Sequence, residues 1–250
     1  MKTIFTILFC LFFATAASSN NDCQYSFDDT TISDGKILYE GEPLTGVLCR
    51  YDENNKLEIK TEFKGGLRDG ISTMYYESGI VQFEVSYKNG KMDGSMKSYY
   101  KSGQIDSETP YKNGAMDGLS RNYYKSGNLE GEIFYKENLT EGAARFYYES
   151  GSLMEVTHLK NGLMEGIQKK YYENGNLAWE IPYKNNLREG IARIYSERGR
   201  LLSQILHRSG KGVSGNCGSG RALTKAELKD WNKRPWPYMK TCRSSLLPLL

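Results

Sequence analysis

The sequence is poor in several features that would point to catalysis, metal binding or a membrane-spanning helix. Among its 250 residues there are only 2 histidines and 6 prolines, and 33 basic residues almost balance 30 acidic ones. The resulting net charge of +3 argues against a dedicated nucleic-acid binder, which usually carries a strong basic excess. No Cys-x-x-Cys spacing occurs, so a zinc site is not expected. No apolar run reaches the ~20 residues that a transmembrane helix requires.

The longest apolar run lies at the N-terminus and is typical of an export signal. Lys2 supplies a short basic start, Ile4 to Phe13 form the apolar core, and Ala14-Thr15-Ala16 offers small residues for cleavage. We therefore predict a signal peptide over residues 1–19 and an exported protein, periplasmic or secreted. The alternative is that the run forms an apolar N-terminal strand of the mature protein.

Four cysteines follow the predicted signal and favour disulfides, because an even number in an exported chain is typical of a disulfide framework. Four cysteines allow three pairings. They fall as two pairs near the two ends of the chain, so we expect the local pairing Cys23–Cys49 and Cys217–Cys242.

The dominant feature of the chain is a period of 24 residues that runs from Gly46 to about Val213 without insertion or deletion. A fixed period of this size predicts stacked supersecondary units. Three columns define it: a glycine, a tyrosine five residues later, and a turn residue four residues after the tyrosine. The tyrosines are Tyr51, Tyr75, Tyr99, Tyr123, Tyr147, Tyr171 and Tyr195.

Each repeat predicts two strands and two tight turns. In the copy that begins at Gly70, residues 71–76 suit a strand, and Glu77-Ser78-Gly79 is a turn signal. Residues 81–87 alternate apolar and polar side chains, as a strand with one buried face does. Asn89-Gly90 then predicts a hairpin turn, because both residues reach positive φ at little cost. No stretch between the glycines is long enough for a helix.

These units predict an all-β fold, an elongated single-layer antiparallel sheet of about seven stacked hairpin repeats over residues 46–213. Fourteen strands spaced by ~4.8 Å would make a ribbon about 65 Å long. Pro110 and Pro182 occupy one column of the second strand, where a ladder tolerates proline at a bulge or where its missing N–H faces no partner.

The repeat, read as G-x-x-x-x-Y-Y-x-x-G-x-L…Y-K-N-G-x-x-D/E-G in Gly94 to Gly118 and Gly166 to Gly190, resembles the MORN repeat in its bacterial variant form. Proteins with this repeat are often labelled YwqK-type antitoxins. The resemblance implies β-hairpins stacked into an extended, curved sheet that serves as a protein scaffold, in dimerisation or, in some members, in phospholipid contact. The export signal and the cysteine-bearing ends depart from the family's simplest form.

The two ends lack the period and are expected to cap it. Residues 20–45 would cover the first hairpin, since an uncovered edge strand invites pairing with other chains. In the C-terminal segment, residues 214–250, Thr224-Lys225-Ala226-Glu227 fits a capping box and predicts a short helix to about Lys233. Trp231, Trp236 and Tyr238 either pack on the last hairpin or bind a ligand.

Catalysis is poorly supported. His158 and His207 lie in repeat columns and are better explained as variants of a tyrosine or proline position than as a general base. The acidic residues recur at the turns, which indicates scaffold rather than an active site, and we expect no cofactor or metal. These residues are Asp69, Asp93, Asp117, Glu141, Glu165 and Glu189.

A basic row runs along the turns, one residue before each Asn-Gly or its equivalent. Charges spaced by roughly 10 Å along one edge could meet anionic lipid headgroups. The alternative is a row of solvated turn residues, partly neutralised by the acidic row. The basic residues are Lys64, Lys88, Lys112, Lys136, Lys160, Lys184 and Arg208.

A second tyrosine column follows the first and is expected to point to the opposite face of the sheet. A single-layer sheet cannot bury both faces, and exposed aromatic surface tends to mark interaction sites. The alternative is that these rings pack flat against neighbouring turns. The candidate partner-binding residues are Tyr76, Tyr100, Tyr124, Tyr148 and Tyr172.

The sequence thus predicts an exported, non-enzymatic scaffold that binds a protein partner along its sheet, with toxin neutralisation as the function that the family label suggests. The alternative is a peripheral envelope protein that binds anionic lipid through the lysine row. An enzyme acting on glycan or peptidoglycan is the least supported class. We expect no nucleic-acid partner.

Overall fold

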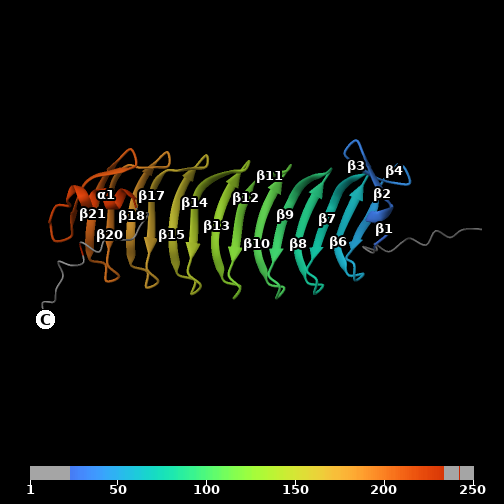
Figure 1. Ribbon diagram of the computed structural model, residues 1–250, viewed down its shortest axis with the longest axis horizontal. Coiled ribbons are helices and arrows are strands. Elements are labelled where there is room, and N and C mark those ends of the chain that lie inside the picture. Colours follow the sequence, from blue (N-terminus) through green and yellow to red (C-terminus); the bar gives the residue numbers. More distant parts are fainter. Residues whose placement is uncertain (1–22, 234–241, 243–250) are drawn as a thin grey trace, which may run out of the picture.

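The computed structural model describes residues 23–233 and Cys242, so the predicted signal peptide lies outside the described residues. The molecule is an elongated ribbon of short strands that run across its long axis (Figure 1). One sheet holds 19 strands, and from β5 onward neighbouring strands run antiparallel. The short strands β11, β16 and β19 lie in line with β12, β17 and β20 and pair with the same partners, β10, β15 and β18. Of the described residues, no helical segment has the length and apolar character needed to cross a bilayer.

The repeats supply most of the sheet. Each contributes one strand that starts at or just before the periodic glycine and ends at the tyrosine, followed by one strand of 8 residues. The prediction of an all-β ribbon of stacked hairpins is confirmed. The strands are β5 Gly46–Tyr51, β6 Leu57–Lys64, β7 Leu67–Tyr75, β8 Val81–Lys88, β9 Lys91–Tyr99, β10 Ile105–Lys112, β11 Ala115–Met116, β12 Gly118–Tyr123, β13 Leu129–Lys136, β14 Leu139–Tyr147, β15 Leu153–Lys160, β16 Leu163–Met164, β17 Gly166–Tyr171, β18 Leu177–Lys184, β19 Leu187–Arg188, β20 Gly190–Tyr195, β21 Leu201–Arg208 and β22 Lys211–Cys217.

Two kinds of turn alternate along the array. At the first, Asn89 and Gly90 have φ of 49° and 79°, as a two-residue primed hairpin requires. At the second, the amide of Gly79 donates to the carbonyl oxygen of Tyr76 (2.8 Å), and Gly79 has φ of 82°. This is a type I turn closed by a left-handed glycine, the usual three-residue hairpin loop.

The Asp-Gly or Glu-Gly step that opens each repeat after the first forms a bulge. Opposite Pro110, the amide of Asp117 donates to the proline carbonyl oxygen (3.0 Å), and Gly118 follows with φ of 126°. A side chain at Gly118 would place its Cβ 2.7 Å from Cγ of Pro110. The proline column therefore lies against a bulge, where its missing N–H leaves no ladder bond broken.

The N-terminal cap, residues 23–45, closes the first edge of the sheet. Its elements are β1 Tyr25–Ser26, the 3-10 turn η1 Phe27–Asp29, β2 Thr30–Ser33, β3 Lys36–Tyr39 and β4 Glu42–Pro43. Strand β1 pairs in parallel with β5, and Cys23 is joined to the fully buried Cys49. A small core of Leu48 and Phe63 packs with Tyr25 and Tyr39.

The C-terminal cap closes the other end with α1 Lys225–Lys233. The predicted capping box is present: the amide of Thr224 donates to the Glu227 carboxylate (2.7 Å), and the amide of Glu227 to the Thr224 hydroxyl (3.3 Å). The second predicted disulfide, Cys217–Cys242, joins this segment to β22. Trp236 and Tyr238 lie outside the described residues, as does the side chain of Trp231.

Candidate functional site

The strand register divides the side chains of the sheet between two faces. On the first, which we call the capped face, small side chains of directly paired residues contact each other across neighbouring strands. The hydroxyls of Thr61 and Ser72 lie 2.7 Å apart, and those of Thr109 and Ser120 lie 2.8 Å apart. On the second, which we call the charged face, Glu84 lies directly opposite Lys97, and Lys97 opposite Glu108.

Both caps pack on the capped face. Leu48 and Phe63 contact the N-terminal cap, while Trp179, Ile181 and Ile205 form the core beneath α1, with Leu228 packed against it. Figure 1 shows α1 in front of the last strands, so the face toward the viewer is the capped face. Between the caps no other described segment covers it from about β7 to β17, a distance of roughly 40 Å at ordinary strand spacing, and we call this the open part.

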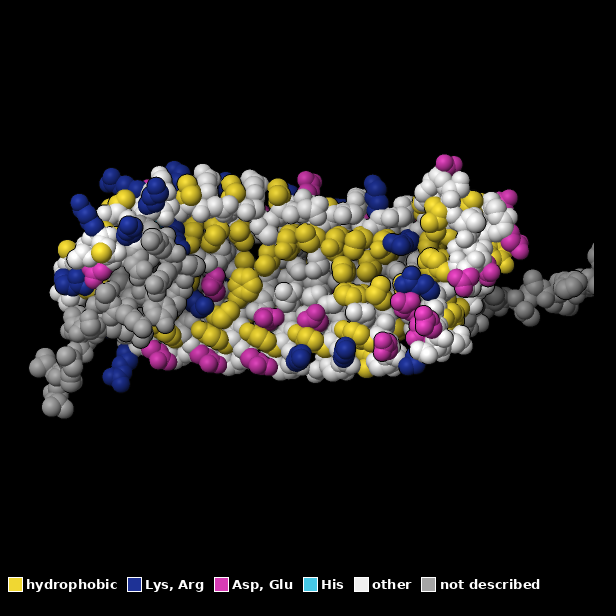
Figure 2. Space-filling model, viewed as in Figure 1, with side chains coloured by type: hydrophobic (Ala, Val, Ile, Leu, Met, Phe, Trp, Pro, Cys, Tyr) yellow, Lys and Arg dark blue, Asp and Glu magenta, His cyan; other side chains and the backbone are white. Residues whose placement is uncertain are grey.

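The open part of the capped face is hollowed and carries a band of hydrophobic side chains (Figure 2). Its lining follows from the strand pairs Phe83 with Met74 and Val85 with Met96. Nearly all of these side chains are half-buried, so they are held by their neighbours and still reach solvent. Aromatic and methionine residues that share the register of these pairs extend the band: Tyr87, Met92, Tyr111, Met116, Tyr135 and Phe146.

The second tyrosine column lies along one rim of the capped face. Tyr172 packs against the core beneath α1, and the Tyr100 hydroxyl lies near Asp106, which accepts from Ser98 of this face. Each hydroxyl donates to the carbonyl oxygen of the first tyrosine in the next repeat, at 2.6–2.9 Å. The five rings are half-buried and tie neighbouring repeats together, as packing against the neighbouring turn requires: Tyr76, Tyr100, Tyr124, Tyr148 and Tyr172.

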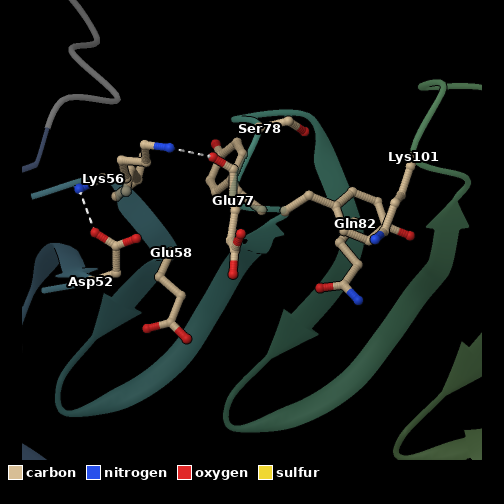
Figure 3. A pocket seen from close by; sticks show the side chains of 10 residues that line it. Asp52, Lys56, Glu58, Glu77, Ser78, Gln82 and Lys101 are labelled. Atoms are coloured by element: carbon tan, nitrogen blue, oxygen red, sulfur yellow. Dashed lines mark hydrogen bonds between the residues drawn. The ribbon is translucent and has the colours of Figure 1, made fainter. Parts of the chain in front are cut away.

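At the N-terminal end of this rim lies a hollow of about 610 Å³. Figure 3 shows Lys56 reaching across it to donate to the carbonyl oxygen of Glu77 (3.0 Å), while Asp52 accepts from the amide of Lys56 (2.9 Å). Tyr76, Gln82 and Lys101 complete the wall. Lys56 and Asp52 thus bond to backbone groups of the turns.

The charged face carries a ladder of alternating charge, broken at Val156, that sequence reasoning missed. Arg145 bonds to Glu132 (3.3 Å) and Arg193 to Glu180 (2.8 Å), and both glutamate side chains are only 17% exposed. Opposite charges directly across strands stabilise a sheet by a few tenths to about 1 kcal/mol per pair. In order along the array the ladder runs Glu84, Lys97, Glu108, Arg121, Glu132, Arg145, Val156, Lys169, Glu180 and Arg193.

The first tyrosine column lies beside this ladder. Tyr99 donates its hydroxyl to Glu84 (2.6 Å), and Tyr147 donates to Glu132 (3.3 Å). Burial, followed by the hydrogen bond and charge of Glu84, raises the pKa of Tyr99 to about 12. Successive charges in the ladder alternate in sign and are spaced by 13 and 11 residues in turn, as in Glu84, Lys97 and Glu108. This spacing was the sequence signal that could have revealed the ladder.

The basic row and the acidic row both lie at the primed turns, but their side chains make different contacts. The carboxylate of Asp93 accepts from the amide of Asn113 (3.0 Å), and that of Glu141 from the amide of Asn161 (2.8 Å). The lysines are exposed, and none of them is within 4.0 Å of a carboxylate among the described residues. Among the described residues no direct ion pair therefore joins the two rows, and the acidic groups bond to the backbone of the next turn.

The two histidines differ in environment. His207 is fully buried on the capped face, where burial and the charge of Arg188 lower its pKa. His158 is exposed on the charged face, and its Nδ1 lies 3.2 Å from the carbonyl oxygen of Ile167. Within the described ranges, no group of three or more His, Cys, Asp or Glu side chains could hold a metal ion.

Comparison with known proteins identifies the repeat. The family model described as MORN repeat variant matches residues 44–64, 68–89, 92–113, 116–137, 140–161 and 164–185, together just over half of the chain. The chain belongs to this family. The pair β20–β21, outside the matched ranges, keeps the same register as a seventh repeat. Proteins built from MORN repeats are generally non-catalytic scaffolds.

Other comparisons add little. No curated protein matches the chain. Among solved structures, a complex described as TcdB2-TccC3-Cdc42 is 14% identical with a TM-score of 0.15, over 66% of this chain and 12% of that one. A TM-score this low does not indicate a shared overall fold. The two disulfides indicate that the MORN protein folds in an oxidising, exported environment.

Proposed function

We propose that this MORN repeat protein is an exported, non-enzymatic scaffold whose open capped face binds a protein partner. The observation that carries the proposal is a hollowed band of aromatic and methionine side chains, bounded at each end by a disulfide-held cap. Tyrosine, phenylalanine and methionine are enriched at the cores of protein interfaces. Half-buried side chains lose little freedom on binding, which favours affinity.

The second tyrosine column contributes to this surface as its rim. The ring edges of Tyr100, Tyr124 and Tyr148 remain half-exposed although their hydroxyls are bonded to the backbone. Rigid aromatic rings whose positions are fixed before binding are the usual anchors of an interface. Toxin neutralisation is the specific form of this function that the family label suggests, with the toxin as the partner seated on the capped face.

Site-specific photo-crosslinking tests the proposal. A photoreactive residue at Phe83 on the capped face should give one discrete adduct in the producing cells, and the same residue at Phe134, on the charged face and 40% exposed, should give none. With the partner purified, Phe83→Glu should weaken binding by about thirtyfold, the effect of losing a hot spot. Phe134→Glu is the matched control. Adducts from Phe134 alone would overturn the choice of face.

Lipid binding through the lysine row is a second candidate, favoured by one further observation. In the C-terminal half of the array, an exposed leucine pairs directly with the lysine at each primed turn: Leu139 with Lys136, Leu163 with Lys160, and Leu187 with Lys184. Such an edge offers both charge and apolar side chains to a membrane surface, with each near-surface cation contributing about 1 kcal/mol.

Vesicle flotation distinguishes the two candidates. Binding to anionic vesicles should fall when Lys136, Lys160 and Lys184 are changed to Glu together, and it should collapse at high salt. A triple variant at the opposite edge of the sheet, Lys101→Glu with Lys125→Glu and Arg198→Glu, is the charge-matched control. Flotation that ignores the triple variant would remove the lipid candidate.

A further inference from the structure

The charged ladder is interrupted once in the middle of the array, at Val156. At the equivalent place in other repeats, a glutamate lies between two cationic side chains: Glu108 between Lys97 and Arg121, and Glu180 between Lys169 and Arg193. Thr73 and Gln204 also depart from the charge pattern, but they stand at the two ends of the ladder. Val156 alone stands between intact charges, with Arg145 on one side and Lys169 on the other.

The missing carboxylate removes an acceptor that two equivalent tyrosines use. Tyr99 and Tyr147 each donate to the ladder glutamate 15 residues earlier, and for Tyr171 that position is Val156. Among the described residues, the Tyr171 hydroxyl has no hydrogen-bond partner, and Lys169 has no carboxylate within 4.0 Å. Arg145 keeps its bond to Glu132 on its other side.

These donors border an apolar hollow of about 430 Å³, within the range of small-ligand sites. Val156 and Ile167 supply apolar lining, and His158, Lys169 and Tyr171 line it as well. The ring of His158 is held by its bond to the Ile167 carbonyl oxygen. The hollow therefore combines apolar surface with an ammonium and a hydroxyl, and a guanidinium lies on the adjacent strand.

We propose that this hollow, the Val156 site, binds a carboxylate attached to an apolar body. The carboxylate takes the place of the absent glutamate between Arg145 and Lys169 and accepts from the Tyr171 hydroxyl. The apolar body covers Val156 and Ile167. Two sources supply this chemistry, a free aliphatic or aromatic acid and a glutamate flanked by apolar residues in a partner chain. The site lies on the charged face, so it stands independently of partner binding on the capped face.

The site is tested by methyl NMR titration of the full exported chain with four probes. Hexanoate and the peptide acetyl-Leu-Glu-Leu-amide should shift the Val156 and Ile167 methyl signals saturably. Hexanamide and the Leu-Gln-Leu peptide, which lack the charge, should bind about tenfold more weakly or not at all, as expected for loss of charge-assisted hydrogen bonds. Tighter binding of the peptide identifies a partner's glutamate as the source, and tighter binding of hexanoate identifies a free acid.

Variants separate this site from general charge attraction. Val156→Glu completes the ladder and should abolish both titrations while raising the midpoint of unfolding. Lys169→Gln and Tyr171→Phe should each weaken binding by about fivefold or more, whereas the ladder controls Lys97→Gln and Tyr123→Phe should leave it unchanged. Equal responses to hexanoate and hexanamide would overturn the proposal. Binding that survives Val156→Glu, or the absence of any saturable shift, would do so as well.

Discussion

The hydroxyl of Tyr124 donates a hydrogen bond of 2.7 Å to the main-chain carbonyl oxygen of Tyr147, the last residue of β14 in the following repeat. The same bond joins each of five successive repeats to the next. In a linear array, stability is approximately the sum of the repeats and of the interfaces between neighbours. A side chain that fixes a neighbour's backbone therefore acts on the interface, which a search for exposed binding residues would not reveal.

We expect Tyr124→Phe to destabilise the array by about 1 kcal/mol, because the Tyr147 carbonyl loses its partner while the ring keeps its packing. Tyr123→Phe is the matched control, since the Tyr123 hydroxyl makes no hydrogen bond among the described residues. Urea unfolding of both variants measures the difference. Equal midpoints for the two variants would show that the hydroxyl column does not stabilise the interface between repeats.

If the ring of Tyr124 also anchors a partner, Tyr124→Ala should weaken binding by about 2 kcal/mol, whereas Tyr124→Phe should not. Substitution of Lys136 should mainly slow association and change its salt dependence. Binding kinetics with the partner identified by crosslinking would measure the affinity of the Tyr124 variants and the association rate of the Lys136 variant. Circular dichroism checks that each variant is folded. A Phe variant that binds as weakly as the Ala variant would assign the effect to the fold.

Within the acidic row, we expect substitution of Asp93 and of Asp117 to have different effects on stability. Asp93→Ala removes the acceptor of the Asn113 amide, which lies in a turn with φ of 52°, and should cost about 1 kcal/mol or more. Asp117 accepts no hydrogen bond through its side chain among the described residues, so Asp117→Ala should cost much less. Hydrogen exchange at the Asn113 amide should quicken only in the first variant.

We expect alanine at the bulge glycine Gly118 and at the turn glycine Gly127 to differ in their effect on stability. Gly118→Ala sets a Cβ against Pro110 and keeps an unfavourable φ, so we expect a loss of about 2–4 kcal/mol. Gly127→Ala has a φ of 88°, nearer the left-handed region, with no atom within 4 Å, and should cost only about 1 kcal/mol. Thermal or urea unfolding of the pair measures the joint cost of the contact with proline and of the wider φ at Gly118. A Gly127 variant as unstable as the Gly118 variant would assign the cost to φ alone.

The sequence predicted the features that depend on local chemistry. Asn89-Gly90 indicated a primed turn, Thr224 and Glu227 indicated the helix start, and the 24-residue period aligned the strands. Contacts between repeats were harder to predict from the sequence. They join residues that are 20 or 23 positions apart, and strand register and bulges decide which of these residues come together. A bulge beside each tyrosine shifts the register by one residue, so the partners of Tyr99 and Tyr100 could not be assigned by counting.

The partner of the acidic row shows the same limit. Asp93 was close to Lys88 in sequence, which suggested neutralisation, yet its carboxylate bonds to the turn of the next repeat. The Val156 interruption was visible as a departure from the Glu column, but its meaning depended on knowing that Arg145 and Lys169 flank it.

Alkaline pH should unfold the array in a predictable window. Burial raises the pKa of Tyr99 and of Tyr100 to about 12, helped by Glu84 at Tyr99 and by Asp106 and Glu130 at Tyr100. In an unfolded chain a tyrosine titrates near 10. A group whose pKa is higher in the folded state binds its proton more tightly there, so its stabilisation is complete below about pH 10 and is lost as pH rises towards about 12.

The urea midpoint should therefore fall between about pH 10 and pH 12, and tyrosinate absorbance should show a late-titrating class that vanishes in urea. Tyr99→Phe should make the fall shallower and reduce that class, because it removes one of the shifted hydroxyls together with its bond to Glu84. A native tyrosinate titration centred near pH 10, with no late class, would contradict the raised pKa of Tyr99 and Tyr100.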